Sequence, residues 1–123
     1  MADRKGRVDG TEATEPAELR RLRRRIDALD RRIVRLLNQR AELAREVGRV
    51  KVTTGRRAIR DPQREREVLL RVSMANGGPT PQADLLAVYK RLFAVARSLE
   101  RRDRTRERRA EPFGGVGPAS GDD

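Results

Sequence analysis

The sequence contains no cysteine and no histidine, and only three of its 123 residues, one Tyr and two Phe, are aromatic. The first two absences exclude disulfides, Cys or His metal sites, and any triad or general base built on histidine. The shortage of aromatic residues argues against an all-β sandwich or barrel, because strands favour aromatic and β-branched side chains.

Long apolar runs are missing as well. No segment approaches 18 consecutive apolar residues, so the sequence predicts no membrane-spanning helix. Residues 1–16 lack the apolar stretch of a secretory signal, which leads us to expect a cytoplasmic protein.

Positive charge is present in excess, with 30 Lys+Arg against 19 Asp+Glu and a net charge of +11. Only Lys5, Lys51 and Lys90 are lysines. A pI near 11.5 is typical of proteins that bind a polyanion such as nucleic acid. In a narrower interpretation, some of the arginines bind a small anionic substrate. DNA binding that depends steeply on salt and survives Arg40→Ala would favour the nucleic-acid interpretation.

The chain divides into a periodic middle and two polar ends. We expect a disordered arm over residues 1–16, a helical domain over 17–104, and a disordered tail over 105–123 that is rich in Gly, Pro and charge. A domain of this size buries only a small core by itself.

The first predicted helix covers residues 18–52 and is unusually long. At 1.5 Å per residue it extends about 50 Å, more than the diameter of a domain this small. Such a helix cannot bury its apolar stripe against its own chain alone, so the pattern predicts a second copy as partner. The stripe consists of Leu19, Leu22, Ile26, Leu29, Ile33, Leu36, Leu43, Val47 and Val50.

Two shorter helices follow. Asp61 as N-cap and Pro62 at the first helical position start a helix over 62–75, which the NGGPTP segment ends. The third helix covers 82–103. The predicted fold is therefore all-α, with one very long, one short and one medium helix.

Two cations interrupt the apolar pattern of the long helix. Arg40 stands where the stripe requires an apolar residue, and Lys51 falls on nearly the same face three turns later. An unpaired guanidinium there is costly, so Arg40 either reaches solvent, pairs with a buried carboxylate, or binds an anion.

Charged residues also mark the two shorter helices. Arg64 and Glu65 lie in the first turn of the second helix, where free N–H groups favour anions, although ordinary capping explains such a run equally well. Glu100 extends the Tyr89-Phe93-Ala96 stripe of the third helix, and it either lines a site or marks the point where that helix reaches solvent.

Four motifs together resemble the all-helical class of chorismate mutases, over about residues 19–100. They are LRRRIDALD at 22–30, LLNQRAEL at 36–43, VGRVK at 47–51 and RDPQRE at 60–65. The resemblance implies an intertwined homodimer of three-helix chains, in which the start of the partner's long helix completes each active site.

The implied reaction is the Claisen rearrangement of chorismate to prephenate, which uses no metal or cofactor. Catalysis requires that the dianion be held in a compact conformer and that charge on the breaking ether oxygen be stabilised. By resemblance, Arg40 and Arg23 of the partner subunit bind carboxylates, and Arg64 adds a cation. Lys51 reaches a carboxylate and the ether oxygen. Glu65 accepts from the ring hydroxyl, with Asp61 beside it.

The third helix departs from the family pattern at two positions, with Ala96 for the usual Ser and Glu100 for the usual Gln. Glu100 must carry a proton to donate to the ether oxygen, and we expect its apolar surroundings to raise its pKa. A shifted register, with Ser98 or Arg104 in the site, stays open.

Relatives on this fold rearrange 4-amino-4-deoxychorismate or eliminate pyruvate from isochorismate, and both activities stay open, although the RDPQRE run favours a mutase. A further alternative is a mutase domain that depends on a partner enzyme of the same pathway.

Overall fold

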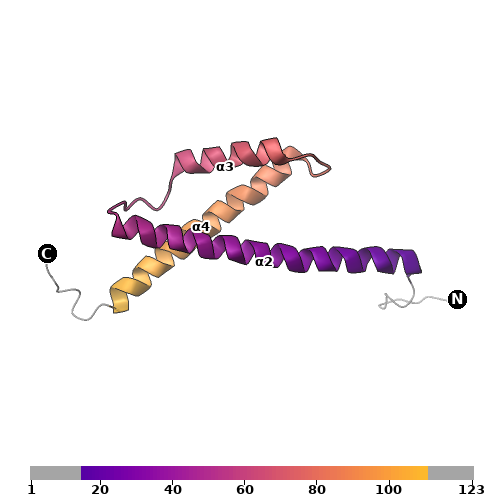
Figure 1. Ribbon diagram of the computed structural model, residues 1–123, viewed down its shortest axis with the longest axis horizontal. Helices are drawn as coiled ribbons and strands as arrows, with labels where there is room; N and C mark the ends of the chain where they lie inside the picture. The colour runs from indigo at the N-terminus through magenta and orange to yellow at the C-terminus, as the bar shows by residue number, and fades with distance from the viewer. Residues whose placement is uncertain (1–14, 111–123) are drawn as a thin grey trace. The chain divides into compact units, whose positions relative to one another are not determined.

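The computed structural model describes residues 15–110, which form three helices and no strand. Helix α2 covers Ala17–Thr53, α3 covers Pro62–Ala75 and α4 covers Gln82–Ala110 (Figure 1). The all-α class is confirmed, and α2 and α3 agree with their predicted bounds within one residue. Residues 1–14 of the predicted arm and 111–123 of the predicted tail lie outside the described residues.

Helix α4 is seven residues longer than predicted, because it ends at Ala110 instead of 103. The prediction of a disordered tail is therefore wrong over residues 105–110. This segment, TRERRA, is highly charged, but it consists mostly of Arg, Glu and Ala, which are good helix formers. The first proline after it is Pro112, so nothing in the segment itself breaks the helix.

Helix α2 has 37 residues, which corresponds to a length of about 55 Å. Its predicted stripe is largely exposed: Ile26 is 56% exposed, Ile33 50% and Leu36 58%. Within α2 the chain divides into two compact units, one ending at Gln39 and the other beginning at Arg40. The second unit contains the last turns of α2 and both shorter helices.

Helix α3 begins as its sequence predicts. The Asp61 side chain accepts a hydrogen bond from the Arg64 backbone N–H at 3.1 Å, and Pro62 occupies the first helical position. The turn after α3 is organised by Asn76, whose side chain donates to the Thr80 carbonyl and accepts from the Gly78 N–H. Gly78 has a φ of +81°, a conformation that favours glycine.

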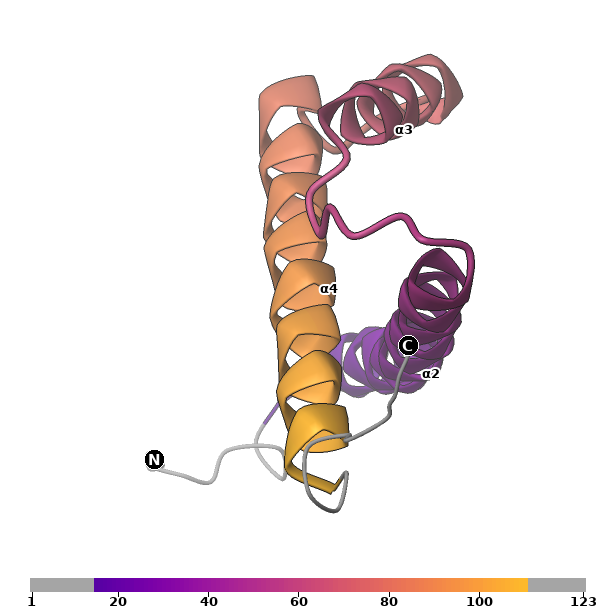
Figure 2. The same ribbon diagram turned by 90° about the vertical axis from the view of Figure 1, so that its left-hand side faces the viewer.

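Helix α4 crosses the last turns of α2 and also contacts α3 (Figure 2). The crossing is held by Arg45, whose Nε and Nη2 donate to the two oxygens of Asp103 at 3.0 and 3.1 Å. The hydrogen bond and charge of Asp103 raise the pKa of Arg45. In the described part of the chain, Phe93 is the only buried large apolar residue, so the core of one chain is very small.

No helix within residues 15–110 is both long enough and apolar enough to cross a lipid bilayer.

Candidate active site

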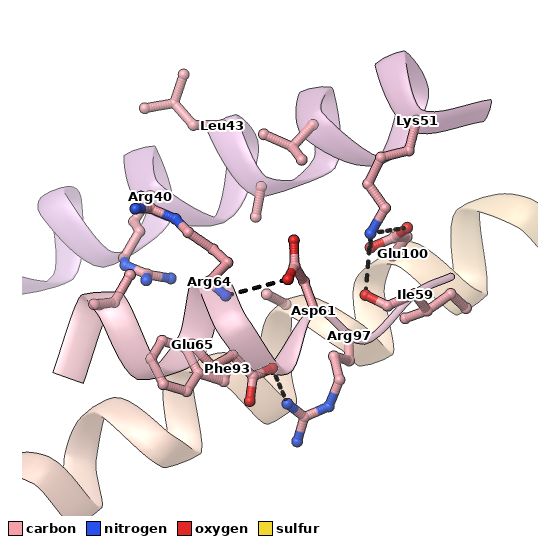
Figure 3. A pocket seen from close by; sticks show the side chains of 14 residues that line it. Arg40, Leu43, Lys51, Ile59, Asp61, Arg64, Glu65, Phe93, Arg97 and Glu100 are labelled. Carbon is pink, nitrogen blue, oxygen red and sulfur yellow. Dashed lines mark hydrogen bonds and ion pairs between the residues drawn. The ribbon is translucent and has the colours of Figure 1, made fainter. Parts of the chain in front are cut away.

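A cavity of about 320 Å³ lies within the second unit, between the last turns of α2, the start of α3 and the middle of α4 (Figure 3). Its polar lining includes four cations and three carboxylates. Seven of the eight residues proposed from the sequence line it: Arg40, Lys51, Asp61, Arg64, Glu65, Ala96 and Glu100. Its apolar wall consists of Leu43, Ala44, Val47, Ile59, Val68 and Phe93.

Arg40 enters the cavity from α2 and lies against two aromatic rings of α4. Its guanidinium carbon is 5.8 Å from the centre of the Tyr89 ring and 5.7 Å from that of Phe93. These contacts stabilise the cation without using its N–H donors. Among residues 15–110, no carboxylate pairs with Arg40, so its planar donor set is free to bind an anion in the cavity.

Lys51 and Glu100 form the most enclosed polar pair of the site, with side chains 12% and 9% exposed. The Lys51 Nζ lies 3.1 Å from Oε2 and 3.3 Å from Oε1 of Glu100. It also donates to the carbonyl of Ile59 at 3.0 Å, in the loop between α2 and α3 (Figure 3). Two acceptors therefore hold the ammonium in place before any ligand enters.

Gly48 explains how Glu100 fits beneath α2. A Cβ atom at Gly48 would lie 3.0 Å from Cγ and 3.2 Å from Cδ of Glu100. Contacts this short require the Glu100 side chain to move by a few tenths of an ångström. The glycine that interrupts the helical pattern is thus a close-approach position, and it lies one turn before Lys51.

We expect Gly48→Ala to lower kcat/KM about tenfold, because the new methyl group displaces the Glu100 carboxylate from Lys51. Loss of overall stability should stay below about 2 kcal/mol, since alanine's better helix propensity offsets part of the crowding. Steady-state kinetics and thermal unfolding measure both effects. Gly77→Ala is the matched control, because nothing lies within 4 Å of its added Cβ. Equal kcat/KM values for Gly48→Ala and Gly77→Ala would contradict the role of Gly48 as a close-approach position.

The start of α3 supplies a second group of polar residues. Asp61 is engaged as the helix cap, so part of its acceptor capacity is used within the chain. The guanidinium of Arg64 is more than half exposed and has only a 3.7 Å contact to Glu67, one turn along α3. It therefore stays available to a ligand at the cavity.

Glu65 points toward α4, where Arg97 forms an ion pair and hydrogen bond with its Oε2 (Figure 3). Arg60 Nε approaches the other oxygen at 3.8 Å. Arg97 lines the cavity as well and was not identified from the sequence. A signal for it existed, because it follows Phe93 by four residues and precedes Glu100 by three, which places all three on one helical face.

The charges of the cavity favour a small dianion. Glu100 is paired with Lys51, and Glu65 with Arg97, which neutralises two of the four cations locally. The third carboxylate, Asp61, caps α3 and lies 3.9 Å from Arg56, which does not line the cavity. Arg40 and Arg64 are left without a carboxylate partner among the lining residues. Two guanidiniums beside an apolar wall suit a compact ligand with two carboxylates.

The remaining sequence-based assignments concern Arg23 and the register of α4. Arg23 belongs to the unit that ends at Gln39, where its Nε lies 2.9 Å from Oε2 of Glu15. On α4, Ala96 and Glu100 line the cavity, whereas Ser98 and Arg104 do not. Arg104 instead contacts Glu100 from the side away from the cavity.

Comparison with known proteins matches this chain to one family. The profile of the family "Chorismate mutase type II" covers residues 22–101. A "Bifunctional chorismate mutase/prephenate dehydratase" of Aquifex aeolicus is 38% identical over 89 residues, which is 69% of this chain and 24% of the relative. Its counterpart in Neisseria gonorrhoeae is 35% identical over 79 residues, 64% of this chain and 21% of the relative. The chain thus spans about a quarter of the length of these curated relatives.

Solved structures extend the match to the fold. Form II of chorismate mutase from Thermus thermophilus superposes with a TM-score of 0.66 at 34% identity, covering 69% of this chain and 96% of that one. Form I from the same organism superposes with a TM-score of 0.61 at 33% identity, covering 64% and 98%. The resemblance drawn from four short motifs is confirmed, and this chain belongs to the chorismate mutase type II family.

Proposed function

We propose that the chain is an isomerase that rearranges chorismate to prephenate in the biosynthesis of aromatic amino acids. The observation that carries the proposal is the convergence of Arg40, Lys51 and Arg64 on the apolar wall of one cavity. Such a site can hold a dianion in a folded conformer. The reaction needs no nucleophile and no proton transfer, which fits a chain without histidine or cysteine.

In the proposed mechanism, Arg40 and Arg64 bind the substrate carboxylates through bidentate contacts. Lys51 contacts a carboxylate and the ether oxygen, and so it stabilises the negative charge that develops there as the bond breaks. Its existing contacts with Glu100 and Ile59 hold the ammonium in position in advance. Rate enhancement then comes from conformational restriction and a preorganised field.

We further propose that the active protein is a homodimer, in which Arg23 of the partner subunit supplies another carboxylate contact. The exposed apolar stripe of α2 supports this proposal, because one chain leaves it uncovered. A cytoplasmic location stays a prediction.

Glu65 bears on which substrate is used. When the cations bind the two substrate carboxylates, Glu65 is the group available to contact the polar substituent on the substrate ring. Arg97 and Arg60 already neutralise that carboxylate, which favours a neutral hydroxyl over the ammonium of 4-amino-4-deoxychorismate. We therefore place chorismate ahead of the amino analogue.

Purified protein tests the proposal when assayed with chorismate, 4-amino-4-deoxychorismate and isochorismate in turn. We expect loss of chorismate absorbance and formation of prephenate, with slower turnover of the other two. No turnover of any substrate by the folded protein would refute the enzymatic function.

Glu100→Gln tests whether this residue donates to the ether oxygen. As the carboxylate paired with Lys51 and Arg104, Glu100 can only accept hydrogen bonds. The glutamine amide carries permanent N–H donors at the same position, so we expect the variant's kcat to exceed the parent's. A kcat equal to or below the parent's in steady-state kinetics would rule this role out.

The names of the curated relatives join a chorismate mutase to a prephenate dehydratase. On that basis we propose that a prephenate-consuming enzyme of the same pathway is a partner of this chain. A rise in the mutase rate when that enzyme is added would support the association.

A further inference from the structure

The carboxyl group of Glu100 is held from two sides at the crossing of α4 and α2. Lys51 contacts it from the cavity, at 3.1 Å from Oε2 and 3.3 Å from Oε1. Arg104, one turn further along α4, donates from Nη2 to Oε2 at 2.8 Å. Arg104 is absent from the cavity lining and instead borders a crevice behind Glu100, together with Gly48 and Val52.

Arg104 also reaches the loop between α2 and α3. Its Nη1 donates to the carbonyl of Arg57 at 2.6 Å, two residues before the carbonyl that Lys51 binds. One guanidinium thus joins Glu100 to the loop that closes this end of the cavity. The Arg104 side chain is only 19% exposed, and its buried Nε has no partner of its own. The two terminal nitrogens of the Arg104 guanidinium are therefore held in place by Glu100 and the Arg57 carbonyl.

We propose that Arg104 is a positioning residue for Glu100, an inference that rests on the proposed mutase function. Because Arg104 engages Oε2, the carboxyl group cannot rotate freely about its last bond. Among the described residues, Oε1 accepts a hydrogen bond only from Lys51, at 3.3 Å, and it is then the oxygen presented to the ligand. Arg104 acts through Glu100 and touches no reacting atom.

The proposal predicts a particular kinetic signature for Arg104→Gln. The variant should lower kcat about tenfold and change KM less than about threefold, because orientation of Glu100 matters most in the transition state. Arg104→Lys keeps the charge and one donor but loses the fork, so it should recover part of kcat. Arg106→Gln, an exposed arginine on the same helix, is the control for loss of one positive charge.

A double-mutant cycle with Glu100→Ala separates positioning from a purely structural role. Once Glu100 is removed, Arg104→Gln should have almost no further effect on kcat. A role limited to holding the loop through Arg57 would lower kcat equally in both backgrounds, which would overturn the proposal. Failure of both Arg104 variants to fold would also overturn it. An inactive parent protein would refute the proposed function itself. If the parent is active but the effects of Arg104→Gln and Glu100→Ala on kcat are additive, only the positioning role is refuted.

Discussion

Lys51→Met is expected to lower kcat/KM about 10³-fold while leaving the protein folded. Lys51 is the one ammonium in the cavity, and it is already aligned by Glu100 and the Ile59 carbonyl. A preorganised cation at a developing oxyanion contributes mainly in the transition state, and removing one such group typically costs 10²–10³ in kcat. Lys51 also contacts a substrate carboxylate in the proposed mechanism, so KM should rise as well.

Methionine is the appropriate replacement because it keeps a similar unbranched stem without the charge. The natural control is Lys90→Met, since Lys90 is the other lysine of the described chain and is exposed on α4. Steady-state kinetics on both variants, with circular dichroism to verify folding, give the comparison. A Lys51→Met enzyme within about tenfold of the parent would remove Lys51 from the catalytic machinery.

Helical periodicity and capping made most of the fold predictable from the sequence. The 3-4 spacing of apolar residues located α2, and the Asp61-Pro62 pair located the start of α3 to the residue. Arg40 and Lys51 were identifiable because a cation in an apolar stripe conflicts with the pattern around it. Local rules of this kind need only neighbouring residues.

Contacts between helices were not predictable in the same way. The aromatic stacking of Arg40 and the pairing of Glu65 with Arg97 depend on how α3 and α4 pack, which no local pattern encodes. Burial of Glu100 also depends on Gly48, a residue 52 positions earlier in the chain. The end of α4 was missed for another reason, because charge density was interpreted as disorder where helix propensity was high.

We expect dimer formation to be the property that a single substitution on α2 changes most. Within residues 15–110 no large side chain is fully buried, and Phe93 is the only large apolar residue in the core. The α2 stripe remains exposed, with Leu29 at 51% and Ile33 at 50%. Each such side chain contributes roughly 1.5–3 kcal/mol when fully buried, so we expect the proposed second copy to supply most of the stability by covering the stripe.

Ile33→Glu should therefore abolish the dimer, the cooperative thermal transition and the activity together. A two-fold interface places the new carboxylate in both copies, and burying each one unpaired costs several kcal/mol. Arg31→Glu is the matched control, because it introduces the same side chain about 200° around α2 from Ile33. Light scattering at micromolar concentration and circular dichroism melting measure the outcome.

An Ile33→Glu protein that is still dimeric would exclude this stripe as the interface. A monomeric parent that turns over chorismate would show that the partner's Arg23 is dispensable, and it would leave Arg40, Lys51 and Arg64 of a single chain as the substrate-binding cations.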